Sequence, residues 1–289
     1  MSIKAYVRRR RMAGIDRVKP SQRVAEIMLL AATCLYLYPL YVVIILAAKS
    51  AKDALFNPLG WPSTIQWSNF TEAYRLMDFG QVFVNSLIIT LASSVGIAVL
   101  SGMASFTIAK RAGKFYTTAY YVIISGLMVP FYMTLSSLMK LVRDLGLMDS
   151  HAGLILTYIG RLLPFAVFLY VGFIRGISNE ICEAATIDGC SPWKLYWRIM
   201  FPVTKHATST LIILNALSIW NDFLLPLLML TSKNKMTIPI VQRLFYSEYN
   251  SKWNLAFAAF LLGMLPMLLF YFIMQKNIVE GIAAGAVKG

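Results

Sequence analysis

Charged side chains are scarce in this sequence. Only 14% of its 289 residues are Asp, Glu, Lys or Arg, whereas soluble domains carry roughly a quarter. Hydrophobic residues make up 58%, and the mean hydropathy is +0.64. A soluble fold this apolar would aggregate, so we take lipid to be the solvent of much of this chain.

Motifs for metals, disulfides and nucleotides are also missing. Cys34, Cys182 and Cys190 form no CxxC pair, so we expect neither a disulfide framework nor a zinc site. His151 and His206 have no carboxylate or cysteine at ligand spacing, and we assign neither a metal nor a catalytic role. Without a G-x4-G-K-[ST] motif the chain is not expected to bind nucleotide phosphates. No acids, bases or metal ligands cluster as in an enzyme, so no catalytic residue and no cofactor are predicted.

Long apolar runs are abundant. A membrane helix needs roughly 20 apolar residues to cross about 30 Å of hydrocarbon. The first run follows Arg8 to Arg11 as in a signal peptide, but it is too long for one and lacks a small-residue cleavage site. Residues 1–289 therefore predict one all-α transmembrane domain of about six helices, with spans at 26–48, 85–109, 115–139, 152–174, 206–231 and 254–275.

The charge that is present is mostly positive. The formal net charge is +14, and the basic residues lie between the apolar runs, which indicates membrane topology rather than nucleic-acid binding. About 17 Lys and Arg lie on the side of the N-terminus and about 9 on the other. The positive-inside rule places both termini, and the loop 175–205, in the cytosol.

Proline and small residues interrupt the predicted spans. Small side chains let membrane helices approach closely, and ordinary helix packing is the simpler explanation for most of them. A proline inside a span leaves a carbonyl that neighbouring helices or water must satisfy. The five such positions suggest a helical bundle with a polar interior: Pro39, Pro130, Pro164, Pro226 and Pro266.

Residues 178–202 contain start and stop signals for two short helices. Ser178 or Asn179 can cap the first, whose first turn carries Glu180 and Glu183, and Gly189 suits the left-handed position after its end. Ser191-Pro192 then restarts a helix, and Pro202 interrupts it. On the first helix one stripe is expected to form a docking surface: Ile181, Ala184, Ala185 and Asp188.

The same segment resembles a known family. Glu183-Ala184-Ala185, Gly189, Ile199 and Phe201-Pro202 are similar to the EAA signature, EAA-x3-G-x9-I-x-L-P, of binding-protein-dependent ABC importer permeases. The one departure is Phe201 for Leu. Trp220-Asn221-Asp222-Phe223 with Pro226, and the closing stretch 281–289, resemble maltose-type (MalG-like) carbohydrate permeases.

The resemblance implies an ABC type I importer fold in the bacterial cytoplasmic membrane, with a coupling helix at about 179–189 that binds a separate ATPase. Partners are then a second homologous permease, two ATPases that bind the ATP and Mg²⁺, and an extracytoplasmic solute-binding protein. The coupling residues are expected to be Glu180, Glu183, Ala184, Ala185, Asp188, Gly189, Ile199 and Pro202. Tail contacts with the ATPase are expected at Gly285, Val287 and Lys288, and binding-protein contacts at Tyr246, Glu248 and Tyr249.

Two charges lie inside the predicted spans. A carboxylate near mid-span costs ~2.5 kcal/mol or more and usually faces a cavity or a partner. Asp222 therefore either lines a translocation path with Trp220 and Asn221, where rings stack and amides bind hydroxyls of a sugar, or pairs with Arg161. By contrast, we interpret Trp61 and Trp67 as anchors at the membrane surface.

Other functions remain open at this point. An ABC importer permease for a polyol, a glycerol phosphate or a peptide would share the EAA segment. A secondary transporter or channel should show inverted repeats and intramembrane carboxylates for ion coupling, and only Asp222 qualifies. The sequence therefore favours a permease that imports a mono- or oligosaccharide.

Overall fold

The computed structural model of the protein describes residues 20–245 and 252–286. Every regular element in these ranges is a helix, which confirms the all-α prediction. Four helices there are long and apolar enough to cross a membrane, and one bent pair would make a fifth. The four are α2 (Pro20–Ala47), α5 (Phe79–Lys110), α8 (His151–Arg175) and α15 (Trp253–Ala286).

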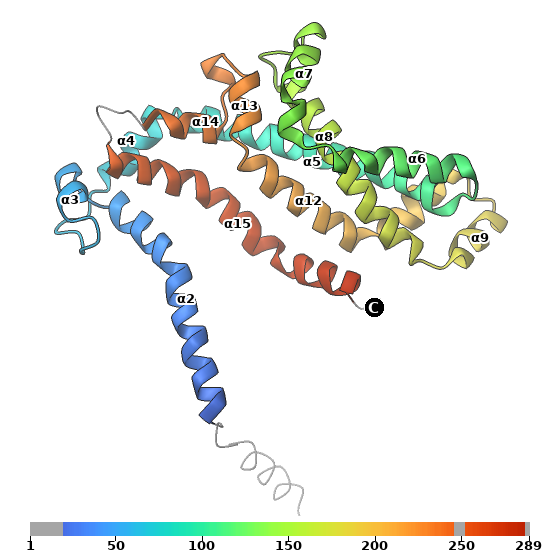
Figure 1. Ribbon diagram of the computed structural model, residues 1–289, viewed down its shortest axis with the longest axis horizontal. Coiled ribbons are helices and arrows are strands. Elements are labelled where there is room, and N and C mark those ends of the chain that lie inside the picture. The colour runs from blue at the N-terminus through green and yellow to red at the C-terminus, as the bar shows by residue number, and fades with distance from the viewer. Residues whose placement is uncertain (1–19, 246–251, 287–289) are drawn as a thin grey trace, which may run out of the picture.

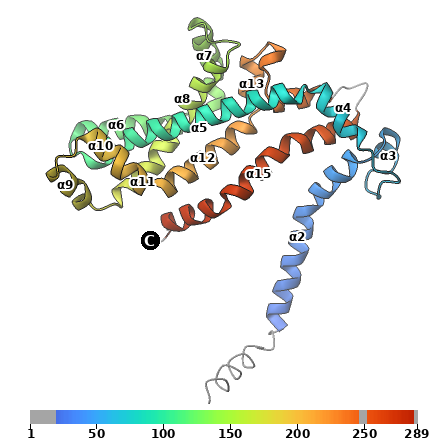
Figure 2. The ribbon, with the colours of Figure 1, turned by 180° about the vertical axis from the view of Figure 1, so that it is seen from behind.

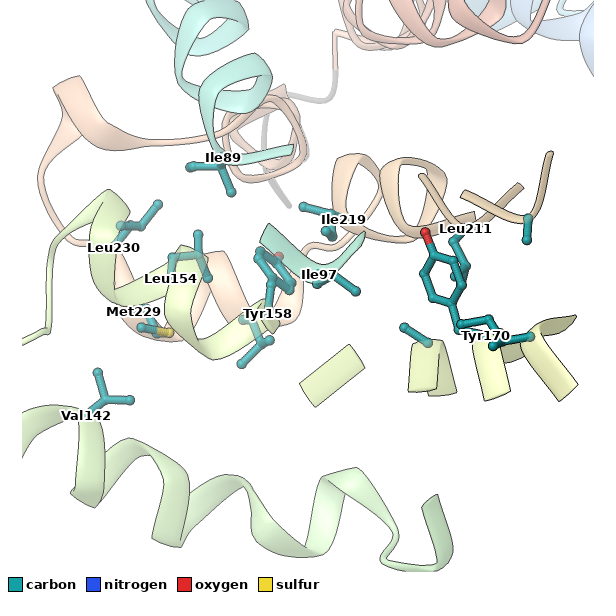
Figure 3. Close-up of a cluster of buried hydrophobic side chains, with 14 of the residues drawn as sticks. Ile89, Ile97, Val142, Leu154, Tyr158, Tyr170, Leu211, Ile219, Met229 and Leu230 are labelled. Atoms are coloured by element: carbon teal, nitrogen blue, oxygen red, sulfur yellow. The ribbon is translucent and has the colours of Figure 1, made fainter. Parts of the chain in front are cut away.

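The centre of the molecule is the packing of α5 against α8 and α12 (Lys205–Trp220), as Figure 1 shows. The α5 face in this contact is rich in small and polar residues, as expected for a bundle with a polar interior. Figure 3 shows the apolar cluster that joins these helices, with Tyr158 and Tyr170 of α8 as its largest side chains. The fully buried small or polar residues of α5 include Ser93, Ser94, Ser101 and Ser105.

The expected span at 115–139 is bent. It consists of α6 (Lys114–Ser125), the 3-10 turn η1 (Gly126–Met128) and α7 (Phe131–Asp144), and its two arms meet at 104°. Pro130 lacks an N–H and disfavours a helical residue before it, and Val129 is accordingly extended with ψ 117°. Hydropathy predicted the length of this span but not its change of direction.

The expected span at 206–231 is divided. Helix α12 ends at Trp220, and α13 (Leu224–Met229) starts after three residues. At 1.5 Å per residue the 16 residues of α12 reach about 24 Å, which is short of a ~30 Å hydrocarbon core. In Figures 1 and 2, α7 and α13 leave the bundle on the same side.

Loops and short helices close the end of the bundle where α2 finishes and α15 begins. Asn69, buried on α4, donates to the carbonyls of Ala47 and Lys49 at 2.8 and 2.7 Å and accepts a hydrogen bond from Asn254. These contacts tie α2 to α15. The elements at this end are α3 (Ala51–Phe56), α4 (Ser68–Leu76), η3 (Lys233–Lys235), α14 (Ile238–Gln242) and η4 (Arg243–Phe245).

A second set of hydrogen bonds fixes the segment that follows α13. Asp149, between α7 and α8, accepts hydrogen bonds from the backbone N–H groups of Thr231 and Ser232, both at 2.9 Å. Its other oxygen accepts from the Ser232 hydroxyl and from the Lys235 ammonium. Since Thr231 and Ser232 lie just past the end of α13, these bonds join the segment after α13 to the loop between α7 and α8.

Candidate functional site

The EAA segment lies at the opposite end of the bundle, beside the last turn of α5 and the end of α8 (Figures 1 and 2). Helix α9 (Asn179–Ile187) begins after Ser178, whose hydroxyl accepts from the N–H of Glu180. Gly189 has φ +77°, and the N–H of Cys190 donates to the carbonyl of Ala185 at 2.9 Å. The expected cap and the expected left-handed glycine are both confirmed.

The second half of the segment is one helical stretch with a widened turn. Ser191 caps α10 (Pro192–Leu195), which runs through the π-helical turn η2 (Tyr196–Met200) into α11 (Phe201–Val203). Pro202 has no N–H to bond the carbonyl four residues earlier, so a regular α-helix cannot continue here. Wide turns of this kind are frequent at functional sites.

An aromatic cluster supports this widened turn. Tyr196 contacts Phe106 of α5 with ring centroids 5.7 Å apart, and Trp197 contacts Phe201 at 5.2 Å. The Tyr196 and Phe201 rings are 6.1 Å apart, and Trp197 also meets Trp193 edge-on. Phe201 replaces the Leu of the family signature, and its ring is part of this cluster.

Helix α9 is fastened to the bundle at its start and near its middle. The Lys110 ammonium of α5 donates to the carbonyl of Ile177 at 2.6 Å and to the side-chain oxygen of Asn179 at 2.8 Å. The Cys182 sulfur lies 3.8 Å from the sulfur of Met200 in η2. Movement of α9 would therefore be transmitted to α5 and to the helical stretch that leads into α12.

Of the expected docking stripe of α9, three residues are exposed and Ala185 is buried. Ala185 is buried and turns toward the chain's own core with Cys182, because residues three apart share a helix face. Ile181, Ala184 and Asp188 are exposed, as are Glu180 and Glu183.

The exposed surface of this site combines acidic and apolar groups. Sequence reasoning missed Ile187, which is 86% exposed, and Trp193, which is 61% exposed. Large apolar side chains this exposed are a marker of an interaction surface. Of the other two signature residues, Ile199 is half-buried and Pro202 is exposed.

A cavity of about 700 Å³ separates α9 and α10 from the end of α5. Phe106, Cys182 and Trp193 are among its apolar walls, and Lys110 and Glu183 add charge. Within the described part of the chain no three His, Cys, Asp or Glu side chains gather as metal ligands. The chemistry of this end suits contact with a protein surface.

The second place singled out by the sequence is the break between α12 and α13. Asp222 accepts from Arg161 at 3.2 Å and from the Tyr158 hydroxyl at 3.2 Å, and its other oxygen accepts from the N–H of Leu224 at 3.0 Å. Of the two alternatives for Asp222, the structure therefore contains the ion pair with Arg161.

Trp220 and Asn221 point elsewhere. The Trp220 indole is buried and donates to the carbonyl of Gly263 in α15 at 3.2 Å. Asn221 is exposed, and its amide donates back to the carbonyl of Leu217. Both line a cavity of about 1060 Å³ between α2, α12, α14 and α15, whereas Asp222 is not among its lining residues. Trp220, Asn221 and Asp222 therefore do not line one common cavity.

Of the expected contacts at the tail and the outer loop, Gly285 lies in the last turn of α15. Outside the described residues lie Tyr246, Glu248, Tyr249, Val287 and Lys288.

Interrupted spans around polar groups, together with a small helical unit docked at one end, define the membrane subunit of a transporter. The comparison with known proteins gives the family. Residues 94–283 match the family "Binding-protein-dependent transport system inner membrane component", and the chain belongs to it. It is thus an inner-membrane permease component of a transport system that depends on a binding protein.

Several relatives align over nearly their full lengths. The probable starch degradation products transport system permease protein AmyC of Thermoanaerobacterium thermosulfurigenes is 33% identical over 88% of this chain and 92% of its own. The melibiose/raffinose/stachyose import permease protein MelC of Bacillus subtilis is 31% identical over 93% and 98%. The multiple sugar-binding transport system permease protein MsmG of Streptococcus mutans is 33% identical over 91% and 95%.

One solved structure has the same fold. A chain from the crystal structure of a bacterial ABC transporter involved in the import of the acidic polysaccharide alginate superposes with a TM-score of 0.78. The match covers 89% of this chain and 98% of that chain at 20% identity. The ABC importer permease fold predicted from the EAA segment is confirmed.

Proposed function

We propose that this chain is the permease of an ATP-driven importer that carries a sugar across the bacterial inner membrane. The observation that carries this proposal is the unit formed by α9 to α11: a capped helix with exposed acidic and apolar groups, fastened to two membrane helices. Because the sequence has no phosphate-binding loop, the energy must come from a separate protein that contacts this unit.

The α9 surface fits the role of a coupling element. Glu183 is exposed and can pair with a basic group of an ATPase, while Ile187 supplies an apolar anchor. Lys110 and Met200 connect the helix to α5 and η2, so a push on α9 reaches the spans. In this assignment the α9 end is cytosolic, and the end with α3 and α4 faces the binding protein.

The proposed assembly has four further protein components. Two ATPases bind ATP and Mg²⁺ on the cytosolic side, and one of them contacts α9. A second, homologous permease completes the membrane part, and an extracytoplasmic binding protein delivers the solute. The predicted contacts of Tyr246, Glu248 and Tyr249 with that protein, and of Gly285, Val287 and Lys288 with the ATPase, remain part of the proposal.

The proposed cargo is a mono- or oligosaccharide. This rests on the relatives, whose names give starch degradation products, melibiose, raffinose and stachyose, or multiple sugars. The cavity beside Trp220 and Asn221 also has Tyr271 and Gln242 on its walls. Aromatic faces and amides are the groups that bind sugar rings and hydroxyls.

A charge reversal at α9 tests the proposal. Glu183→Lys should reduce co-purification of the ATPase and uptake of the sugar, and Gly189→Pro should do so more strongly because it also distorts the end of the helix. The matched control is Glu72→Lys, a reversal of another exposed charge, on α4 at the other end of the molecule. Glu72→Lys should leave ATPase co-purification unchanged. Wild-type levels of both ATPase binding and uptake in the two α9 variants would exclude the coupling role.

A further inference from the structure

Two interruptions of regular helix, and a proline inside a third helix, lie around one point of the bundle. The bend between η1 and α7 falls at Val129 and Pro130, and the division between α12 and α13 falls at residues 221–223. Helix α8 contributes Pro164, and a Cβ on Gly126 of η1 would lie 3.2 Å from its ring. The bend of one span therefore packs directly on the proline of another.

Arg161, one turn before Pro164, connects the two interruptions. Its guanidinium stacks over the ring of Phe131, the first residue of α7, with 3.9 Å to the ring centroid. The same group donates to Asp222 in the break between α12 and α13 at 3.2 Å. A planar, delocalised cation can stack and hydrogen-bond at once, which a lysine ammonium does less well.

Asp222 binds both Arg161 and the backbone at the start of α13. One carboxylate oxygen holds Arg161 and Tyr158, while the other accepts the N–H of Leu224 at the start of α13. Asp222 thus connects the start of α13 to α8. Arg161 connects the start of α7 to the same helix. Beyond the end of α13, the Ser232 hydroxyl donates to Asp149 in the loop between α7 and α8.

We infer that Arg161 and Asp222 are positioning residues for transport. By holding both interrupted spans to α8, they make α7 and α13 change position together when the permease cycles. This inference rests on the proposed transport function, but it concerns a mechanical link inside this subunit rather than the cargo. It explains why the structure keeps two charges within apolar spans, where unpaired charges are costly.

Distances between spin labels test the link directly. Labels carried by non-native amino acids at Met133 of α7 and Leu228 of α13, both exposed, report the separation of the two helices. The full chain is placed in nanodiscs of phosphatidylethanolamine and phosphatidylglycerol and measured by pulsed electron resonance. The chain with its native Arg161 and Asp222 should give one narrow distance distribution.

The test variants remove one feature at a time. Asp222→Asn removes the charge but keeps an oxygen for the N–H of Leu224, Arg161→Lys keeps the charge but loses the planar stack, and Phe131→Leu removes the ring alone. Each should broaden the distribution. In the assembled transporter, Asp222→Asn and Arg161→Lys should lower sugar imported per ATP hydrolysed by about fivefold or more, the lower range for coupling between sites.

Controls separate the link from a general loss of structure. Glu72→Gln removes the exposed ion pair with Lys252, and it should leave the distance distribution unchanged. A variant that does not fold is replaced by Phe131→Leu, which leaves no charge unpaired.

Narrow distributions and unchanged uptake per ATP in the folded variants would overturn the inference. The label measurement needs no cargo, so it decides the role of Arg161 even if the wild-type assembly hydrolyses ATP and imports no sugar. ATP hydrolysis without sugar import would contradict the proposed function but not the role inferred for Arg161 and Asp222.

Discussion

Arg161 on α8 and Asp222 in the break after α12 form an ion pair of 3.2 Å inside the apolar part of the bundle. The pair is not fully enclosed, since 31% of the Arg161 side chain and 15% of the Asp222 side chain stay accessible. Each charge neutralises the other, and the Tyr158 hydroxyl donates a hydrogen bond to the same Asp222 oxygen. Loss of either partner leaves a charge in an apolar setting, which is the situation that membrane proteins avoid.

The first prediction concerns the stability of this pair. Asp222→Ala should destabilise the chain by about 3 kcal/mol or less, below the full range for buried pairs because Arg161 is partly exposed. The double variant Arg161→Met with Asp222→Leu should recover part of that loss, since it leaves no unpaired charge. Thermal denaturation followed by tryptophan fluorescence measures both. A double variant no more stable than Asp222→Ala would contradict the interpretation.

The second prediction concerns pH. Hydrogen bonds from the Ser232 hydroxyl, then from the backbone N–H groups of Ser232 and Thr231, and from Lys235 hold the pKa of Asp149 well below its usual range. A carboxylate with a lowered folded pKa adds stability that is complete above the unfolded value of about 4 and is lost as the pH falls through the folded pKa. The stability that Asp149 adds should thus be constant from pH 7 to about pH 4 and then fall.

Asp149→Asn isolates this contribution from other carboxylates. Asparagine tolerates the left-handed backbone of this position, where φ is +51°, and keeps an oxygen for the backbone N–H groups. The difference in denaturation temperature between the wild-type chain and Asp149→Asn should be level at neutral pH and shrink below about pH 4. A difference that grew as the pH fell would have the wrong sign for this network.

The EAA unit could be predicted from the sequence because its signals are local. A Ser before the first turn, a Gly after the last and a Ser-Pro restart each act through backbone hydrogen bonds within a few residues. Helix α9 accordingly begins at Asn179 and ends at Ile187, inside the expected range of 179–189. What the periodicity could not give was the rotation of this helix, because the packing of Cys182 on Met200 sets which face is buried.

The interrupted spans show the limit of such reasoning. Hydropathy sums over a window and contains no direction, so neither the 104° bend after Val129 nor the turn of α13 could be read from it. The break at Asp222 depends on a contact with Arg161, 61 residues earlier in the chain. The sequence raised that pair as one of two alternatives, and only three-dimensional packing decides between them.

The third prediction concerns the end of α9. Gly189 has open space around it but a φ of +77°, so a side chain there would be strained by the backbone alone. Gly189→Ala should cost about 1 kcal/mol and weaken ATPase binding, whereas Gly189→Asn should cost less because asparagine adopts this conformation more readily. Equal effects of Ala and Asn on ATPase co-purification would contradict the backbone explanation.

The last prediction concerns the contact between α5 and the widened turn. A Cβ on Gly102 would lie 2.4 Å from the Tyr196 hydroxyl oxygen but 3.5 Å from the ring carbon that carries it. Among the described residues that buried hydroxyl has no hydrogen-bond partner, so Tyr196→Phe should be neutral or stabilising by up to about 1 kcal/mol. Gly102→Ala alone should displace η2 from α5 and lower both the denaturation temperature and the ATP hydrolysis coupled to uptake.

The double variant decides whether this clash is the cause. In Gly102→Ala with Tyr196→Phe the new methyl group meets the ring at position 196 and the Tyr170 ring, at 3.5 and 3.7 Å. Both are ordinary contact distances, so stability and coupling should both return close to wild-type values. Interaction between two such neighbouring sites is commonly about 0.5–3 kcal/mol, which thermal denaturation can resolve. If Tyr196→Phe did not rescue Gly102→Ala, the close approach of α5 to the EAA unit would have another origin, such as direct packing of the two backbones.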